Sequence, residues 1–287
     1  AVRKDVRNVF VMGSGNASFE QSKIQHNEWM GVNTTIKATI GPELGIGGML
    51  EAAFPSEPIM LLKSCIGDRA LGWDLLPPGS KGYEFDNFTY AGYHQSPMKW
   101  AVGTTPVPMG GAAGLQYDGD IFRANNVLSN ISTFYPSTPF KKCYGVAGFV
   151  WWQGDKDSRD MSLSTHYEEN LVALIKQLRV QYDAPTAKVT SPAVQSHSSD
   201  TRKPPSILSV FPRRPLPSNR PVGELAHARS THSALPCMVQ FVTASLGQTA
   251  MNDTKSGGGL ILQAMENVAS GTKYPEFKGN VATVYTH

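Results

Sequence analysis

The chain is poor in residues that hold small scaffolds or metal sites together. Its 287 residues include only three cysteines, Cys65, Cys143 and Cys237, and no two of them form a Cys-x-x-Cys pair. At most one disulfide bridge can exist, which excludes a disulfide-built scaffold. The seven histidines show no metal-ligand spacing. We therefore expect no metal ion and no other cofactor.

Long hydrophobic runs are also missing. No stretch approaches the roughly 18 apolar residues that a membrane-spanning helix needs, so the sequence predicts no membrane partner. The start, Ala1 to Asp5, resembles neither a signal peptide nor a chain that begins with an initiator Met, and we expect a cut or processed N-terminus. Because 40% of the residues are apolar, a single domain spanning residues 1–287 can bury a substantial core.

A net excess of basic residues is confined to one segment. The net charge is +3, but residues 190–237 hold six of the 26 basic and two of the 23 acidic residues. The remainder has no basic excess, so nucleic acid is not an expected partner. The same segment contains eight of the 20 prolines and almost no hydrophobic periodicity. We interpret it as a disordered insertion that packs little.

Phosphate-binding loops are absent as well. The glycines at 13 and 15 lead into no predicted helix, and the glycines at 257–259 are not followed by Lys and Ser or Thr. A nucleotide-binding flavodoxin-like domain is therefore disfavoured. Five Asn-x-Ser/Thr sequons occur, but they do not fix a compartment because they function only in a eukaryotic secretory pathway.

Hydrophobic patterning predicts alternating strands and helices. Strands are expected at 6–12, 58–64, 144–152, 238–246 and 280–285. Helices are expected at 42–54, 118–134, 165–182 and 260–268, the third opened by a capping box of Thr165 and Glu168. Residues 17–40 and 70–116 are expected to be irregular, the latter as a wall or lid of a pocket. This alternation predicts an α/β fold, a doubly wound three-layer sandwich with a central parallel sheet.

The stretch at 145–157 organises this prediction. It reads Gly-Val-Ala-Gly-Phe-Val-Trp-Trp-Gln-Gly-Asp-Lys-Asp, an apolar run that ends abruptly in polar residues. A buried parallel strand delivers polar groups to its carboxyl end in this way, and open α/β sheets bind ligands there. The alternative is a core strand followed by an ordinary turn.

Four stretches together resemble one family. The block at 151–157 is similar to the third sequence block of the sialate O-acetylesterase-like carbohydrate esterases, relatives of the SGNH hydrolases. Further similar stretches lie at 40–45, at 63–67 with 71–74, and at 274–282. The resemblance covers residues 3–189 and 238–287, and it implies a domain truncated at both ends and interrupted by an insertion.

The resemblance implies roles for residues at two strand ends. The backbone amide of Gly67 and the side-chain amide of Gln153 correspond to the family's oxyanion donors. Asp155 and Asp157 either orient the Gln153 loop or bind a sugar hydroxyl, unless they are solvated loop acids. Asp68 stands where the family commonly has a second Gly, a departure that bears on the geometry of the oxyanion hole.

Other candidate residues lie nearby. Trp152, with Trp151 and Trp73, either stacks on a sugar ring or belongs to the core. Glu43 and Arg69 are expected to form a buried structural ion pair. The family's Gly-Gln-Ser-Asn-Met nucleophile block is absent, and the partial substitute is Ser14. The family's catalytic Asp-x-x-His pair lies beyond the final strand, and His287 comes too early to match it. We therefore expect this chain to lack both the family's nucleophile and its catalytic His.

These implications define the expected function. The resemblance implies hydrolysis of O-acetyl esters on carbohydrates by a serine-esterase mechanism, with an acetylated carbohydrate as the partner. By the same resemblance, the protein is secreted or periplasmic. If the family's Ser and His lie outside this chain, its turnover should be slight. The alternative is a non-catalytic carbohydrate-binding protein on the same scaffold, which needs the pocket but neither of these residues.

Overall fold

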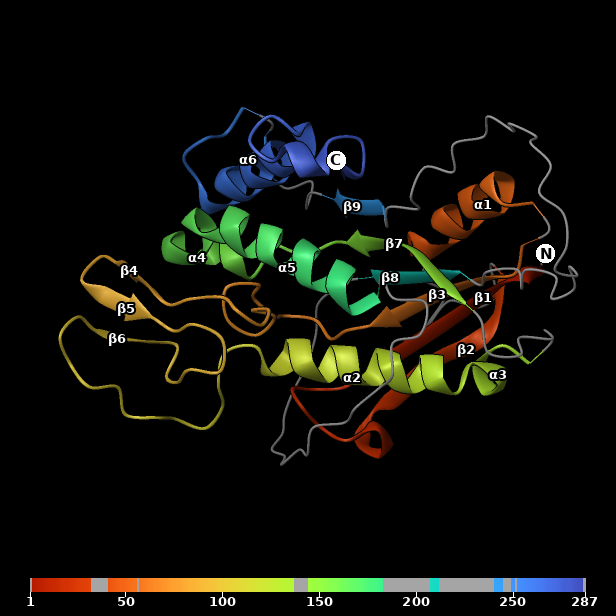
Figure 1. Ribbon diagram of the computed structural model, residues 1–287, viewed down its shortest axis with the longest axis horizontal. Helices are drawn as coiled ribbons and strands as arrows, with labels where there is room; N and C mark the ends of the chain where they lie inside the picture. Colours follow the sequence, from red (N-terminus) through yellow and green to blue (C-terminus); the bar gives the residue numbers. More distant parts are fainter. Residues whose placement is uncertain are drawn as a thin grey trace, which may run out of the picture.

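The computed structural model describes residues 2–31, 41–55, 57–136, 144–182, 207–211, 240–244, 249–250 and 252–285. Within them, a seven-stranded sheet has the order β10-β9-β7-β8-β3-β1-β2. Its strands, in chain order, are β1 (Val2–Met12), β2 (Lys23–Gly31), β3 (Ile59–Ser64), β7 (Gly145–Trp151), β8 (Ile207–Phe211), β9 (Gln240–Ala244) and β10 (Val281–Val284). Helices and strands thus share one α/β fold (Figure 1).

The sheet is mixed and not wholly parallel. Parallel pairing joins β1 to β3, β7 to β9 and β9 to β10. Strand β8 lies between β3 and β7 and runs antiparallel to both, so β3 and β7 point the same way. Strand β2 is antiparallel to β1 at the edge. The carboxyl ends of β1, β3 and β7 therefore meet at one edge of the sheet.

Strands β2 and β8 both depart from the sequence prediction. The β2 segment was expected to be irregular because it carries polar residues without apolar alternation, and most of its residues are exposed or half-buried, as an edge strand allows. Strand β8 belongs to the segment 190–237, which was expected to pack little. The structure describes only Ile207–Phe211 of that segment, and these residues pair with two neighbours in the sheet. The rest of the predicted insertion lies outside the described residues.

The helices and short 3₁₀ turns follow the apolar stripes closely. They are α1 (Glu43–Ala53), α2 (Leu115–Ser129), α3 (Ile131–Phe134), α4 (Met161–Thr165), α5 (Tyr167–Tyr182) and α6 (Gly257–Ser270), with η1 (Phe19–Gln21), η3 (Asp157–Arg159) and η4 (Pro275–Phe277). The predicted capping box is wrong. Asp160 caps α4 by accepting from Ser162 N, whereas Glu168 accepts from Asn267, Tyr274 and Lys273.

Strand β3 explains how the sheet is covered at its centre. All six of its residues are buried. A strand is buried in this way only when neighbouring elements cover both of its faces. Ile59 and Leu61 pack in a small cluster beside α1. Met60 and Leu62 face the large core formed with α2, α5 and α6. Strand alternation thus divides the core between two faces.

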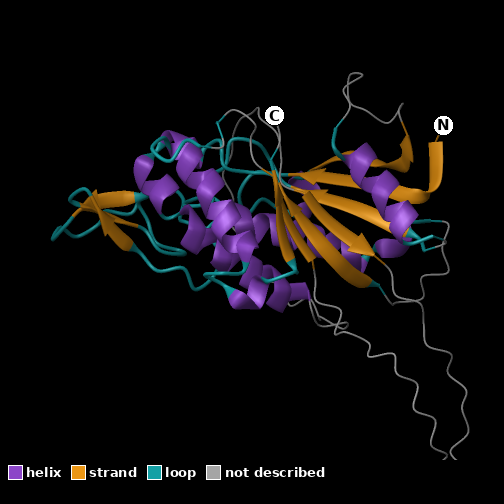
Figure 2. Cartoon of the chain, turned by 90° about the horizontal axis from the view of Figure 1, so that it is seen from above, coloured by secondary structure: helices purple, strands orange, loops and turns teal. Residues whose placement is uncertain are grey.

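A second, three-stranded sheet lies within the predicted loop at 70–116. Its strands are β4 (Tyr83–Phe85), β5 (Phe88–Tyr90) and β6 (Lys99–Ala101), all antiparallel. It projects at one end of the molecule, with the helices between it and the large sheet (Figure 2). Tyr83 stacks on Tyr90 and on His166, which anchors this arm to the helical layer.

Candidate functional site

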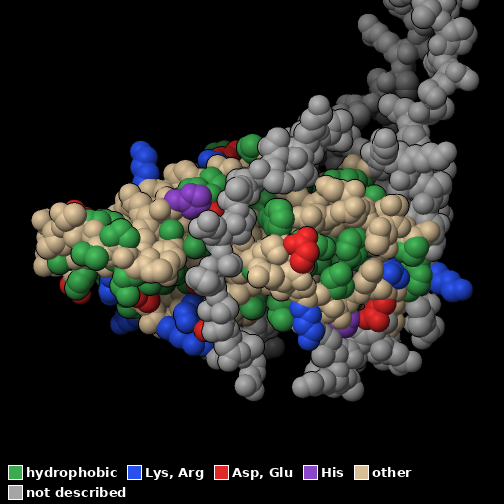
Figure 3. All heavy atoms as spheres, turned by 90° about the horizontal axis from the view of Figure 1, so that it is seen from below, with side chains coloured by type: hydrophobic (Ala, Val, Ile, Leu, Met, Phe, Trp, Pro, Cys, Tyr) green, Lys and Arg blue, Asp and Glu red, His purple; other side chains and the backbone are tan. Residues whose placement is uncertain are grey.

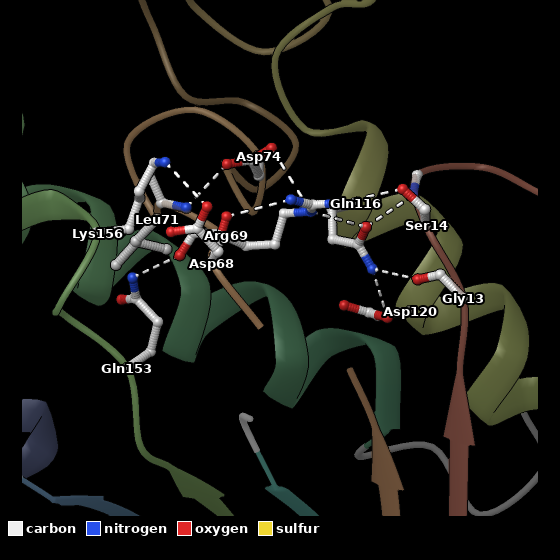
Figure 4. A network of polar contacts seen from close by, with 12 residues as sticks. Gly13, Ser14, Asp68, Arg69, Leu71, Asp74, Gln116, Asp120, Gln153 and Lys156 are labelled. Carbon is white, nitrogen blue, oxygen red and sulfur yellow. Dashed lines mark hydrogen bonds and ion pairs between the residues drawn. The ribbon is translucent and has the colours of Figure 1, made fainter. Parts of the chain in front are cut away.

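Three turns converge at the carboxyl edge of the sheet. Strand register pairs Val11 with Ser64, so Ser14 and Gly67 lie equally far beyond β1 and β3. Leu62 is level with Phe149 through β8, which brings Gln153 to nearly the same height. Although β8 separates β3 from β7, the Gln153 side chain reaches the carbonyl of Arg69, with 2.9 Å between Nε2 and O. Ser14, Arg69 and Gln153, which follow these three strands, therefore share one network (Figure 4).

Helix α2 holds the β1 turn that carries Ser14. Gly15 N donates to Gln116 Oε1 at 2.6 Å, and Gln116 Nε2 donates to Gly13 O at 2.9 Å. The backbone on both sides of Ser14 is thus fixed by one amide side chain. Gly119 allows the close approach, because a Cβ there would lie 1.7 Å from the Gly15 carbonyl oxygen.

A buried ion pair lies beneath this turn. Arg123, which is fully buried, donates from Nη2 to Asp120 Oδ1 at 2.9 Å and from Nη1 to Gly15 O at 3.2 Å. Gln116 Nε2 also donates to Asp120 Oδ1. Burial raises the pKa of the Asp120 carboxyl to about 6, against the opposing effect of Arg123 and Gln116.

Arg69 contacts the Ser14 hydroxyl directly. Its Nη2 donates to Ser14 Oγ at 3.1 Å, and its Nη1 donates to the carbonyl of Asp68 at 3.1 Å. The guanidinium also lies 3.8 Å from Asp74 Oδ1. The predicted ion pair of Glu43 with Arg69 is wrong, because Glu43 pairs with Lys63.

Gln153 is enclosed by partners instead of facing an open site. Its Nε2 donates to Arg69 O and, at 2.6 Å, to Asp157 Oδ2, while its Oε1 accepts from the Tyr167 hydroxyl at 3.0 Å. An amide nitrogen has two hydrogens, and both are used here. In this conformation Gln153 has no hydrogen left for a substrate oxyanion.

Asp157 joins the β7 turn to the β3 turn. Its carboxylate is fully buried and accepts from Leu71 N and Gly72 N, each at 2.8 Å, in addition to Gln153. Of the roles predicted for it, this geometry favours orienting the Gln153 loop over contact with a sugar. Burial raises its pKa to about 6, although the three N–H donors lower it.

Asp68 and Asp155 lie on the surface side of the same turns. Lys156 Nζ donates to Asp68 Oδ2 at 3.2 Å, and Arg159 Nη2 donates to Asp155 Oδ2 at 2.5 Å. Asp68 has φ of 58°, in the left-handed region that Gly adopts freely and that Asp tolerates. This backbone conformation therefore accepts Asp68 and would accept Gly at the same position.

Gly67 and Trp152 are half-buried and lie outside this hydrogen-bonding network. Within the described part of the chain, the Gly67 amide donates to no acceptor. Trp152 is half-buried, whereas Trp151 belongs to the core and donates from Nε1 to the Tyr167 hydroxyl. Trp73 packs against apolar clusters beside the small sheet. Of the three tryptophans, Trp152 is the one that belongs to none of the apolar clusters of the described residues.

The sequence reasoning missed Gln116, Asp120 and Arg123. Their spacing of four and three residues places all three on one face of α2, amid an otherwise apolar stripe. Polar residues at core positions of a predicted helix were the signal that could have identified them. Asp118, two residues from Gln116, lies on another side of the helix and binds His94 Nε2 at 2.7 Å. The pair of His94 and Asp118 therefore does not face the Ser14 turn.

Neither the surface of the molecule nor the comparisons with known proteins assign the chain to a family. On the face shown in Figure 3, Lys and Arg side chains are interspersed with Asp and Glu. Among the described residues, no helix is long and apolar enough to cross a bilayer, and no three His, Cys, Asp or Glu side chains cluster as metal ligands. No protein-family model, no curated protein and no solved structure matches the chain.

Proposed function

We propose that the protein hydrolyses O-acetyl esters of carbohydrates at the carboxyl edge of the sheet, with Ser14 as the nucleophile. The observation that carries this proposal is the hydrogen bond from Arg69 to Ser14 Oγ, which links the β1 turn to the β3 and β7 turns. Acyl transfer needs a fixed nucleophile and donors for the developing oxyanion at one place. The clamped Ser14 turn and the unengaged Gly67 amide supply one of each.

The proposed reaction is a nucleophilic substitution at the acetyl carbon. Ser14 Oγ bonds to the acetyl carbon, and the carbonyl electrons move to the carbonyl oxygen near Gly67 N. The ester bond to the sugar breaks when these electrons return, and the sugar oxygen takes a proton from solvent water and leaves as a hydroxyl group. The Ser14 hydroxyl proton passes to solvent water, because the only hydrogen bond to Ser14 Oγ among the described residues comes from Arg69. Water then hydrolyses the acetyl-enzyme. Trp152 is proposed to stack on the sugar ring.

The proposal extends to the architecture of the domain and to the residues that contact the sugar. We propose that residues 1–287 form one doubly wound, three-layer domain of the SGNH type. The burial of β3 on both faces supports it, and an experimental structure with helices on only one face would contradict it. Asp155 and Asp68 are proposed to contact sugar hydroxyls after exchange of their surface ion pairs.

Hydrolysis of p-nitrophenyl acetate and of an O-acetylated monosaccharide tests the proposal. Ser14→Ala should abolish release of acetate, whereas Ser129→Ala is the matched control, since Ser129 is exposed at the end of α2. Both variants should unfold at the same urea concentration as the parent. Equal hydrolysis by Ser14→Ala and the parent chain would reject Ser14 as the nucleophile.

A specific observation favours the second candidate, a carbohydrate-binding protein without catalysis. Both amide hydrogens of Gln153 are engaged, and no imidazole among the described residues contacts Ser14 Oγ. Titration calorimetry with an O-acetylated monosaccharide, beside the hydrolysis assay, separates the candidates. Binding that is lost in Trp152→Ala, retained in Ser14→Ala and accompanied by no acetate release would support the binding protein.

A further inference from the structure

We infer that Arg69 is the positioning residue that activates Ser14, a role that neither the strand-end pattern nor the resemblance assigns to it. The inference rests on the proposed function, because it concerns the reactivity of the same hydroxyl. Arg69 is not a residue carried over from the esterase family. Its role follows from the contacts that its guanidinium and its backbone make in this chain.

The geometry of the guanidinium points to Ser14. Nη2 donates to Ser14 Oγ at 3.1 Å, and Nε lies 3.4 Å from Gln116 Oε1, which also accepts from Gly15 N. The same side chain thus touches the hydroxyl and the amide that fixes the turn on either side of it. The contacts of the guanidinium with Ser14 Oγ and with Gln116 Oε1 together limit both the rotamer of Ser14 and the position of its backbone.

The charge of Arg69 gives the contact a chemical effect. A cationic donor beside a hydroxyl stabilises the alkoxide form and favours its nucleophilic attack. Asp74 offsets part of this charge, but its nearest oxygen is 3.8 Å from Nε, beyond hydrogen-bond distance. The side chain of Arg69 is 17% exposed, so solvent only partly weakens its field at Ser14.

The backbone of Arg69 couples this role to the β7 turn. Its carbonyl accepts from Gln153 Nε2, and Gln153 is held in turn by Asp157. The polar groups of the β7 turn therefore support the chain segment that carries Arg69. In this arrangement Gln153 acts through Arg69, while the guanidinium provides the positive charge next to the reacting oxygen.

Labelling with a fluorophosphonate probe tests the inference. The rate of covalent labelling is measured from pH 6 to 10 and the modified serine is located by mass spectrometry, in the parent chain and in Arg69→Gln, Arg69→Lys and Arg69→Ala. Lys81→Gln, which removes an exposed cation in a distant loop, is the control. The urea midpoint of each variant monitors folding.

We expect labelling at Ser14 in the parent. Arg69→Gln should slow it about tenfold across the pH range, because loss of the neighbouring charge lowers the alkoxide fraction of Ser14 about tenfold, as a change of about one pKa unit does. Arg69→Lys, which keeps the charge, should retain most of the parent rate, and added guanidinium should partly restore Arg69→Ala.

Three results would overturn the inference. Equal rates and pH profiles in the parent and Arg69→Gln would reject the role of Arg69 and leave the proposed function standing. Slow labelling that neither Arg69→Lys nor added guanidinium restores would reduce Arg69 to a structural residue. Absence of Ser14 labelling in the parent would reject the proposed function and this inference together.

Discussion

The β1 turn and the β7 turn leave the sheet at the same edge but are stabilised in opposite ways. The β1 turn is held from outside, by Gln116 and Arg123 of α2, and leaves the half-buried Ser14 hydroxyl at the site. The β7 turn is held from inside, because Gln153 and Asp157 direct their polar groups toward each other and toward the β3 turn.

This difference separates residues that serve a ligand from residues that serve the scaffold. A polar side chain whose donors and acceptors are all engaged inside the protein contributes to stability and to the shape of the site. A polar side chain with one partner and partial exposure is available for a further contact. By this criterion Ser14 belongs to the second group, and Asp157 with Gln153 belongs to the first.

The largest expected effect concerns the support of the β1 turn. Arg123→Ala leaves Asp120 buried without its cation, and breaking a buried pair in this way costs about 3–5 kcal/mol of unfolding free energy. Urea unfolding measures the loss. Arg159→Ala, which removes an exposed ion pair, should change stability by less than about 1 kcal/mol. Similar small losses in both variants would contradict the assigned support.

A somewhat smaller loss is expected from the β7 turn. Asp157→Ala leaves Leu71 N, Gly72 N and one Gln153 hydrogen without acceptors, at a cost of about 2–3 kcal/mol. Thermal unfolding followed by circular dichroism measures this loss. The comparison fails if Asp157→Ala is as stable as the parent, or if Asp155→Ala, with its half-buried carboxylate, is destabilised equally.

The pH dependence of stability should reveal Asp157 and Asp120. Burial raises the pKa of each from 3.8 to about 6, so the native state holds these protons more tightly than the unfolded chain does. Their contribution is fully present below about pH 4 and is lost as the pH rises through about 6, by roughly 3 kcal/mol per group.

Urea unfolding between pH 4 and 7 measures this contribution as the difference between the parent and Asp157→Asn. The stability of the parent relative to the variant should fall with rising pH, and Asp86→Asn is the control for the same substitution at an exposed position. A parent that gains stability relative to Asp157→Asn over this range would show that the three N–H donors outweigh burial.

The smallest effect concerns the left-handed backbone at Asp68. Asp68→Gly removes a conformational cost and an exposed ion pair, so its stability should stay within about 0.5 kcal/mol of the parent. Asp68→Ala keeps the cost and loses the pair, for a loss of about 1 kcal/mol. Guanidinium chloride midpoints compare the two, and an Ala variant more stable than the Gly variant would contradict the strained conformation.

The sequence predicted the elements that are buried on a regular period. Strand β3 and helices α1, α5 and α6 carry apolar runs or stripes, and the structure confirms them to within a few residues. It did not predict β2, because an edge strand needs no buried face. Nor could it predict that β8 joins the sheet, since strand pairing across a long sequence separation depends on tertiary contacts.

The site was predicted less completely for a related reason. The position of Ser14, Gly67 and Gln153 at one edge follows from strand ends, which hydrophobic runs indicate. The hydrogen-bond partners of each side chain do not follow from strand ends, because they depend on the relative positions of the elements to within about an ångström. Thus Glu43 binds Lys63 instead of Arg69, and Gln153 faces inward instead of toward a ligand.

Gly119 offers a way to engineer this edge. The missing side chain lets α2 approach the Gly15 carbonyl, and a single methyl group at this position would collide with it. Gly119→Ala would therefore act as a spacer that lifts the turn away from the helix without deleting any polar group. A graded series of Ala, Ser and Val would set the height of the Ser14 hydroxyl above the sheet in steps of one or two atoms.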